Sequence, residues 1–320
     1  MIFFSLPEVL FMLIGAIVLD WLIGDPKWLP HPVIFIGSWI SYLEKRLLPG
    51  QAKRRNGILM MLIVTLSSFT LVWGLSAAAS WVHPWAVYAV NTWLISTTIA
   101  IKGLKDAAML VYEPLSQGDL TEARKYTGYI VGRDTGELDA SELSRATVET
   151  VAENTVDAVI SPLFYALLGA APLAMLYRAT NTLDSMVGYR NAKYVHFGWA
   201  SARLDDVLNW IPARVTGWLL ILVSIPYRYA SPVQAWKAVR AFAHLHPSPN
   251  SGIPEAAVAG GLGIELGGLN RYGGVASERA RLGWPNRPIV KEDIVHTVRL
   301  LYGVSYLVMG GLLCAACGWL

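Results

Sequence analysis

Hydrophobic residues gather along this chain in long uncharged runs, which short polar segments separate. Because the hydrocarbon core of a bilayer is about 30 Å thick, a transmembrane helix needs roughly 17 to 25 apolar residues. Such runs cover residues 9–23 (interrupted only by Asp20), 57–82, 84–101, 158–177 and 300–320. The pattern predicts an all-α, polytopic integral membrane protein with about four clear transmembrane helices. The run 158–177 is not counted among the four, because it is predicted to be partial or re-entrant.

Two apolar segments are predicted to be partial or re-entrant. The run 158–177 contains Gly169 and Pro172 in LLGAAPLA. This break favours a re-entrant helical hairpin, which is tolerated where protein or water covers the backbone. Residues 215–227 number only thirteen and fit a half-helix or an interfacial helix better than a span. Six full spans are the alternative.

Composition and charge agree with a membrane protein. Of the 320 residues, 54% are hydrophobic and 15% are charged, against roughly a quarter charged in soluble domains. The net charge of +3 arises in loops rather than on a soluble basic face, so membrane lipid is an expected partner and nucleic acid is not. The loop 24–56 is placed in the cytoplasm by the positive-inside rule. It carries Lys27, Lys45, Arg46, Lys53, Arg54 and Arg55 against Asp25 and Glu44.

The remaining topology follows from this loop. The turn at residues 83–84 has no Lys or Arg, so it is expected outside, and the polar segment after residue 101 returns to the cytoplasm. We expect one integral membrane domain over residues 1–320, with a helical cytoplasmic insertion at 102–157 and a polar cytoplasmic loop region at 228–295. A full crossing by 158–177 would put the basic loop 181–203 outside, which its charge disfavours.

Within the insertion, two acid-x-x-Glu patterns mark helix starts. They are Asp119 with Glu122, and Asp139 with Glu142. An acid at the N-cap accepts a hydrogen bond from the backbone of the first turn, and a Glu three residues later can reciprocate. Helices are therefore predicted to begin after residues 119 and 139.

Three acids follow in ETVAENTVDAVISPLFY. Glu149, Glu153 and Asp157 stand at i, i+4 and i+8, so on an α-helix they share one face, with Asn154 beside them. Their mutual repulsion would be compensated by a cation. Their oxygens suit Mg²⁺, which takes one or two carboxylates together with substrate phosphates. The alternative is a solvated helix face at the entry to the membrane.

A second set combines both signs of charge in a short loop between apolar segments. Its members are Asn181, Asp184, Arg190, Lys193, Arg203, Asp205 and Asp206. The bases suit phosphate or carboxylate groups, and the acids suit a metal or the orientation of those bases. The alternative is a cytoplasmic cap rich in ion pairs.

A third set lies in HLHPSPNSGIPEAAVAGGLGIELGG, residues 244–268. Prolines and glycines interrupt this stretch, so that backbone amides can be left free for an anion. Its polar candidates are His246, Ser248, Asn250, Ser251 and Glu255. The glycines miss both common nucleotide-binding spacings. We interpret Gly261, Gly263 and Gly267 as small residues that let helices pack closely in a membrane.

In this order, the motifs resemble the adenosylcobinamide-phosphate synthases, the CobD/CbiB family of cobalamin biosynthesis. The resemblance rests on DWLIGDPKWLPHPVIFIG, VGRDT, ETVAENTVDAVISPLFY, NTLDSMVGYRNAKY, ARLDDVLNWIPARVTG and HPSPNSGIPEAAVAGGLGIELGG. Ala158 and Ala170 depart from it, since glycine is typical of the family at both positions. We expect these departures to affect packing more than chemistry.

The resemblance implies a multi-pass enzyme of the bacterial inner membrane with its active site facing the cytoplasm. The implied reaction joins adenosylcobyric acid, a corrinoid, to aminopropanol phosphate or aminopropanol through an amide, giving adenosylcobinamide phosphate. Such a carboxylate–amine ligase uses ATP and Mg²⁺. A homo-oligomer and an association with other membrane enzymes of the pathway are both open. So are an acyl phosphate and an acyl adenylate intermediate.

The chemistry that the resemblance implies assigns roles to the three sets. Glu149, Glu153 and Asp157 are expected to hold the metal of Mg·ATP. Phosphate or nucleotide is expected to contact Asn154, Arg190, Lys193, Arg203, Ser248 and Asn250. Catalytic roles are expected for Asp184, Asp205 and Asp206, as a second acidic cluster for a metal or the amine, and for His246 as proton acceptor.

Two rival functions come from other classes. Re-entrant half-helices and intramembrane acids also occur in transporters of charged solutes, which would turn over no ATP here. A membrane sensor like AmpE would show neither catalysis nor transport.

Overall fold

The computed structural model describes residues 4–26 and 31–318, so Lys27 of the basic loop lies outside the described residues. Its contacts group into two compact units. The first unit comprises Met1–Ala100, Asp157–Asn209 and Met309–Leu320, and the second comprises Ile101–Val156 and Trp210–Val308. The expected single domain, its insertion at 102–157 and its loop region at 228–295 are not tested by this grouping and stay predictions.

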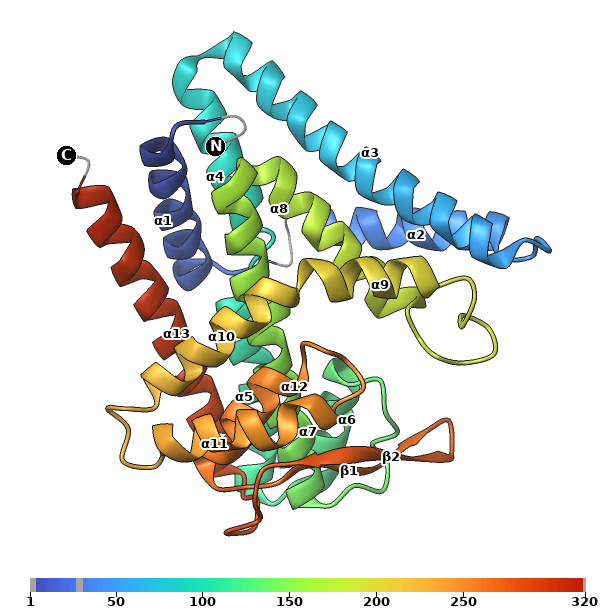
Figure 1. Cartoon of the computed structure of the whole chain (residues 1–320), viewed down its shortest axis with the longest axis vertical. Coiled ribbons are helices and arrows are strands. Elements are labelled where there is room, and N and C mark those ends of the chain that lie inside the picture. The colour runs from blue at the N-terminus through green and yellow to red at the C-terminus, as the bar shows by residue number, and fades with distance from the viewer. Residues whose placement is uncertain (1–3, 27–30, 319–320) are drawn as a thin grey trace. The chain divides into compact units, whose positions relative to one another are not determined.

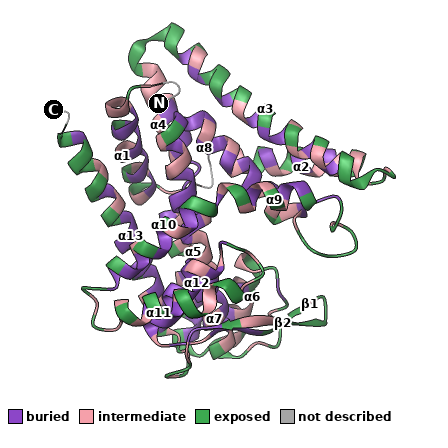
Figure 2. Ribbon diagram, viewed as in Figure 1, coloured by how far each residue is buried: buried purple, intermediate pink, exposed green. Residues whose placement is uncertain are grey.

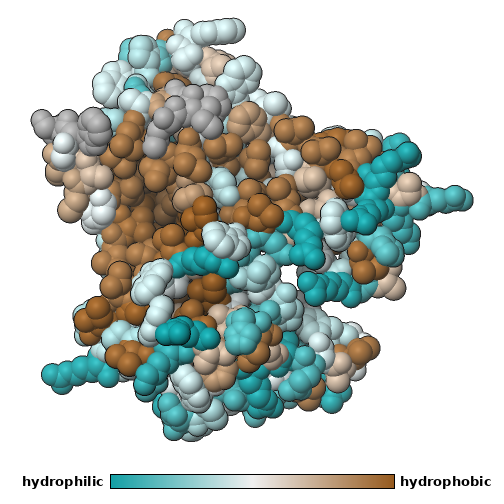
Figure 3. All heavy atoms as spheres, viewed as in Figure 1, coloured by the Kyte–Doolittle hydropathy of each residue, from teal (hydrophilic) through white to brown (hydrophobic). Residues whose placement is uncertain are grey.

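The first unit is built of helices (Figure 1). They are α1 (Leu6–Leu22), α2 (Pro32–Leu47), α3 (Lys53–Val82), α4 (Pro84–Ser96), α8 (Ser161–Val187) and α9 (Trp199–Leu208). Both α2 and α4 begin with proline at the first turn, where its missing N–H costs nothing, and a histidine side chain caps each of them. Hydrophobic side chains gather over α1 and the middle of α3 on the face seen in Figure 3, as expected for surfaces that meet lipid.

The helix α8 is a hairpin rather than a straight rod. Its backbone leaves the helical region at Gly169 and Ala170, and Figure 1 shows the ribbon doubling back. On a straight helix, residues 157 and 181 would lie about 36 Å apart. Instead, Asn181 Nδ2 donates a hydrogen bond to Asp157 Oδ2 at 3.2 Å. The predicted helical hairpin is confirmed, while its depth in a membrane stays a prediction.

Two contacts hold the break in α8. The rings of Tyr165 and Tyr177, one from each half, stack with centroids 5.3 Å apart. The backbone N–H of Ala171 donates to Asn91 Oδ1 on α4 at 3.3 Å. A buried side chain therefore satisfies a backbone donor that the break would otherwise leave without a partner.

The second unit combines helices with one β-hairpin. Its elements are α5 (Ile101–Gln117), α6 (Leu120–Ile130), α7 (Ala140–Thr155), α10 (Trp210–Val223), α11 (Pro232–Phe242), α12 (Gly252–Leu262), β1 (Leu266–Tyr272), β2 (Val275–Leu282) and most of α13 (Glu292–Cys317). The predicted helix starts are confirmed, since Asp119 caps α6 and Asp139 caps α7. Figure 2 shows α12 buried along most of its length.

Glycine lets α11 and α12 approach closely. A Cβ on Gly260 would lie 2.3 Å from Ala238 Cβ, so glycine is required for close packing there. Gly261 also lies on α12, but a Cβ there would meet its neighbours at the ordinary distances of 3.6 and 3.7 Å, so the packing interpretation of Gly261 stays a prediction. The packing interpretation is wrong for Gly263, which ends α12 in the left-handed region, and for Gly267, which lies on β1. These two glycines serve backbone conformations with positive φ that other residues rarely adopt.

The β-hairpin contradicts the all-α prediction. The antiparallel pair joins Tyr272 to Val275 across a two-residue Gly273–Gly274 turn in which both φ angles are positive. Gly-Gly between two alternating segments is a signal for this turn, and it was not used in the sequence interpretation. The range 228–295, expected to be a polar loop region, thus contains α11, α12 and the hairpin.

The described helices include three that are long and apolar enough to cross a membrane: α3, α13 and the continuous stretch Ala140–Val187. A fourth arises if α9 and α10, bent by 48° relative to each other, count as one broken span. At 13 residues α4 is too short for this criterion, and α1 has 17. The count is three to four candidates, against the four clear spans plus two partial segments expected.

Candidate functional site

The acids of α7 reach a buried polar centre in the second unit. Glu149 uses both carboxylate oxygens there. Its Oε1 accepts from the backbone N–H of Gly267 at 2.7 Å, and its Oε2 accepts from Arg133 of the VGRDT loop. Both side chains of the ion pair are almost fully buried. Because a lone buried charge is costly, Arg133 and Glu149 depend on each other.

The second acid of α7, Glu153, makes fewer hydrogen bonds than Glu149. Glu153 Oε1 accepts from the Ser251 hydroxyl at 3.0 Å. Among the described residues, its Oε2 accepts no hydrogen bond and is available to a ligand. Asn154 donates only to the carbonyl of Thr150 in its own helix.

The segment before α12 turns tightly on its own side chains. His246 Nδ1 accepts from the Ser248 N–H at 3.0 Å, and the Ser248 hydroxyl oxygen accepts from the N–H groups of Asn250 and Ser251. The expectation of free amides is therefore wrong at these three positions, because the Ser and His side chains satisfy them locally.

His246 and Glu255 form a second buried titratable pair of this centre. His246 Nε2 makes no hydrogen bond to a described residue and lies 3.7 Å from Glu255 Oε1. Burial lowers the pKa of His246, against the attraction of Glu153. Burial, together with the charges of Glu153 and Glu149, raises the pKa of Glu255 well above its usual range. The lowered pKa of His246 favours the uncharged imidazole, which is the form that can accept a proton.

Two basic side chains balance these acids. Arg133 donates to Asn270 Oδ1 at 2.5 Å in addition to Glu149. Arg279, on β2, interacts electrostatically with Glu255, Glu153 and Glu149. The hairpin thus supplies a base, an amide and the Gly267 N–H to the same centre. This arrangement can bind anionic oxygens and move a proton.

The first unit contains a polar network of its own. Asn181 Nδ2 donates to Asp157 Oδ2 and lies 3.4 Å from Asp205 Oδ1, while Asn209 Nδ2 donates to Asp205 Oδ2 at 2.9 Å. The hydroxyl of Tyr177 donates to Asn209 Oδ1 at 2.9 Å. Asp157 therefore groups with Asn181 and Asp205.

The expected single face of three acids is interrupted before Asp157. A π-helical turn over Val156–Ile160 follows α7 and changes the angular spacing of the side chains. Asp157 consequently belongs to the first unit, whereas Glu149 and Glu153 belong to the second.

Charged side chains at the edge of the first unit pair with one another. Arg203 lies 3.7 Å from Asp206, and Arg190 also acts on Asp206 electrostatically. The Lys193 ammonium lies 2.8 Å from Glu44, and this contact raises the pKa of Lys193. These contacts fit the alternative of an ion-paired cap and leave the phosphate roles of the three bases as predictions.

A preformed metal site is absent from residues 4–26 and 31–318, where no group of three or more His, Cys, Asp or Glu side chains is arranged to hold an ion. The metal roles of Glu149, Glu153 and Asp157 therefore stay predictions.

Comparison with known proteins now decides the family. A sequence profile described as "CobD/Cbib protein" matches residues 13–301. The chain belongs to the CobD/CbiB family.

Relatives of this CobD/CbiB chain cover nearly its whole length. "Cobalamin biosynthesis protein CobD" of Halalkalibacterium halodurans is 50% identical over 293 residues, covering 90% of this chain and 91% of the relative. A protein of the same name from Geobacter metallireducens is 47% identical, covering 93% and 94%. "Cobalamin biosynthesis protein CbiB" of Salmonella typhimurium is 45% identical, covering 95% and 96%. No solved structure matches.

The structure groups the candidate residues of this CobD/CbiB chain differently from the three sets predicted from the sequence. It brings Glu149, Glu153 and His246 together, with Ser248 and Asn250 in the adjoining loop. Asp184, Asp205 and Asp206 lie with Asp157 in the first unit. Their catalytic roles, like the others, are untested.

Three side chains of the buried centre were missed. Arg133 stood in VGRDT, a motif that carried the resemblance without receiving a role. Asn270 and Arg279 lie on the hairpin that was not foreseen, so its Gly-Gly signal was the only sequence feature that could have led to them.

Proposed function

We propose that this CobD/CbiB chain acts in cobalamin biosynthesis as an ATP-dependent amide-forming synthase. It joins a carboxylate of adenosylcobyric acid to the amine of aminopropanol phosphate or aminopropanol. The resemblance and the names of the relatives support the pathway. The buried centre of the second unit supports the type of reaction.

The chemistry needs three kinds of group. A carboxylate is a poor electrophile, so phosphoryl transfer from Mg·ATP first converts it to an acyl phosphate and releases ADP. The amine then attacks the carbonyl carbon, phosphate leaves, and the ammonium proton passes to a base. The site must therefore bind Mg·ATP, stabilise negative oxygens and accept a proton.

Residues of the buried centre fit these tasks. Glu153, through its available Oε2, and Asn154 would hold the Mg²⁺ that enters with ATP. Arg133, oriented by Glu149, would stabilise the charge of the transferred phosphoryl group. His246 would accept the ammonium proton.

The observation that carries the proposal is the placement of His246, whose Nδ1 is engaged by the Ser248 N–H while its Nε2 lies 3.7 Å from Glu255 Oε1, beside the acids of α7. A buried base kept neutral by its surroundings is typical of proton-transfer sites. A histidine in this setting has no evident packing reason to keep Nε2 without a hydrogen bond to any described residue.

The test uses detergent-purified protein with Mg·ATP, adenosylcobyric acid and aminopropanol phosphate. A new amide, detected by mass, and ADP release that requires both other substrates are expected. His246→Gln and Glu153→Ala should lose the activity by about 100-fold or more, as expected for a lost general base or metal ligand. His244→Gln is the matched control, since His244 is exposed two residues away.

Contradicting outcomes are distinct. No amide from the wild type under any nucleotide condition would overturn the synthase. Full activity of His246→Gln and Glu153→Ala would overturn the assignment of the centre. Uptake of a charged solute by proteoliposomes without ATP turnover would favour the transporter instead.

A further inference from the structure

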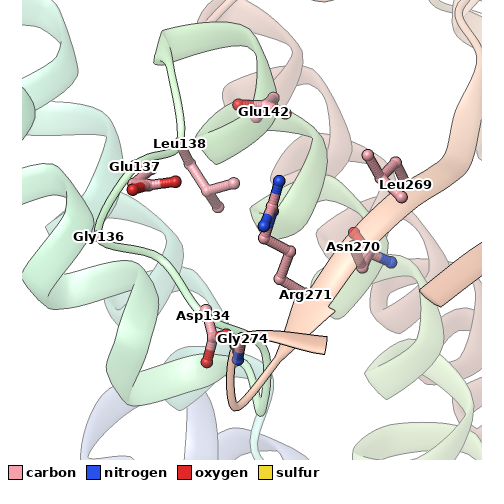
Figure 4. A pocket seen from close by; sticks show the side chains of 9 residues that line it. All are labelled: Asp134, Gly136, Glu137, Leu138, Glu142, Leu269, Asn270, Arg271 and Gly274. Atoms are coloured by element: carbon pink, nitrogen blue, oxygen red, sulfur yellow. Dashed lines mark hydrogen bonds between the residues drawn. The ribbon is translucent and has the colours of Figure 1, made fainter. Parts of the chain in front are cut away.

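A pocket of about 430 Å³ opens in the second unit beside the buried centre (Figure 4). Its walls come from the VGRDT loop, the start of α7, and the hairpin. Its lining residues are Asp134, Gly136, Glu137, Leu138, Glu142, Leu269, Asn270, Arg271 and Gly274. Pockets of this size suit small molecules.

Two walls are held rigidly by backbone contacts. Asp134 accepts from the N–H groups of Gly273 and Gly274 at 3.0 and 2.7 Å, which ties the loop to the hairpin turn. Glu142 accepts from the Asp139 N–H at 3.0 Å as part of a capping box. The backbone contacts of these two acids tie the loop, the hairpin turn and the start of α7 into the walls of the pocket.

Two other charged side chains are not engaged in such contacts. Glu137 and Arg271 are exposed, and neither side chain makes a hydrogen bond or an ion pair within the described part of the chain, although the Arg271 carbonyl accepts from the Asp134 N–H. Figure 4 shows them on different walls, with the Glu137 carboxylate directed toward the pocket interior. One wall thus offers an anion and the other a cation.

We propose that this pocket binds a small zwitterion that carries an ammonium and a phosphate group, with the ammonium at Glu137 and the phosphate at Arg271. The identification of this ligand as the amine donor rests on the proposed function. An amino alcohol phosphate has both groups on a short chain. A nucleoside triphosphate is disfavoured because its several negative charges would face the carboxylates of Asp134, Glu137 and Glu142 with only the Arg271 guanidinium to balance them. A corrinoid is far larger than the pocket.

Asn270 connects the pocket with the buried centre. Its side chain is 3% exposed and lines the pocket, while its Oδ1 accepts from Arg133, the partner of Glu149. Its Nδ2 is buried and has no hydrogen-bond partner among the described residues. A ligand oxygen in the pocket could accept a hydrogen bond from Asn270 Nδ2. Asn270 would then link the ligand to Arg133 and, through it, to Glu149.

The test measures binding to the detergent-purified full chain without nucleotide, by calorimetric titration. Aminopropanol phosphate is compared with propyl phosphate, which lacks the amine, and with aminopropanol, which lacks the phosphate. Each single-group compound is expected to bind about 10- to 100-fold more weakly, the usual effect of one lost charge-assisted contact.

Variants test whether the phosphate binds at Arg271 and the ammonium at Glu137. Arg271→Gln should weaken aminopropanol phosphate about 10-fold or more and leave aminopropanol unchanged, whereas Glu137→Gln should abolish the preference over propyl phosphate. Arg281→Gln and Glu278→Gln are the matched controls, because both residues lie on the same hairpin outside the pocket lining. In turnover assays the first two variants should raise KM for the amine donor more than they lower kcat.

Two results would contradict the proposal that this pocket binds the zwitterion. One is equal affinity for all three compounds, and the other is wild-type affinity and KM in both Arg271→Gln and Glu137→Gln. The second result with continued amide formation would leave the proposed function standing. Conversely, the expected binding pattern in a protein that forms no amide would support the pocket and overturn the synthase.

Discussion

Burial decides the charge of the side chains at the centre of the second unit. The same loss of solvation lowers the pKa of His246 and raises the pKa of Glu255, because each group then favours its uncharged form. Burial therefore favours the uncharged forms of a base and an acid that lie close together. Neither state could be read from the residue types alone.

This protonation state makes a prediction about pH. Since the pKa of His246 is lowered from 6.5, the imidazole stays neutral at pH 7 and becomes protonated only as the pH falls through that lowered value. We expect kcat for amide formation to decline on this acid limb and His244→Gln to keep the limb. In the residual activity of His246→Gln the limb should be missing. Its persistence there would assign the proton to another group.

The buried pair of Arg133 and Glu149 makes a prediction about stability. Removing one partner leaves the other charge buried, which typically costs about 3–5 kcal/mol. Arg133→Met should therefore lower the thermal midpoint strongly, and the double variant with Glu149→Met should recover a large part of the loss. Lys125→Met, which breaks the exposed pair with Glu122, should change the midpoint little. A recovery too small to measure would mean that the two charges are not coupled.

At the scale of elements, the break in α8 is the feature on which the first unit depends. Ala170 has φ of +51° and ψ of −149°, a conformation that side chains strongly disfavour and glycine tolerates. It is the sole non-glycine residue with positive φ among the described residues. The departure from the expected glycine was predicted to affect packing, and the backbone shows that it also introduces strain.

Ala170→Gly is therefore expected to stabilise the protein. The relieved strain, of about 1–3 kcal/mol, exceeds the added unfolded-state entropy of glycine, about 0.4–1 kcal/mol. The thermal midpoint in detergent should rise by a few degrees. Ala174→Gly, a control in a helical part of α8, should lower it. A fall of the midpoint in Ala170→Gly as well would show that the strain is not relieved.

Local signals in the sequence predicted elements well where the cause was local. The caps at Asp119 and Asp139 and the break at Gly169 depend on a few neighbouring residues. The hairpin was missed because Gly267 was interpreted as helix packing and the Gly273–Gly274 turn signal received no interpretation. The partners of Glu149 could not be predicted, since Arg133 and Gly267 meet it only after three separate segments have folded together.

At the scale of the whole molecule, the hairpin in α8 resolves a conflict in the predicted topology. A full crossing by residues 158–177 would separate Asp157 from the loop 188–198 by a bilayer. The hydrogen bond between Asp157 and Asn181 places both at the open end of the hairpin. If the hairpin enters a membrane from this end, the basic loop after α8 is expected on the same side as Asp157, as its charge predicts.

Cysteine labelling tests this topology directly. Cys314 and Cys317 are both exposed, so they are first replaced by serine. Single cysteines then replace Gln51, Ala192 and Ser277, which are exposed in the segments predicted to be cytoplasmic, and Val82, which is 81% exposed before the predicted external turn.

A membrane-impermeant thiol reagent should label Val82→Cys in intact cells and the other three only in inverted membrane vesicles. The reason is that the α8 hairpin returns the chain to the side it came from, so the loops around residues 51 and 192 share one compartment. The cysteine-free variant sets the background. Labelling of Ala192→Cys from outside alone would mean that α8 crosses the bilayer, and it would place the acids and bases of residues 181–206 away from cytoplasmic ATP.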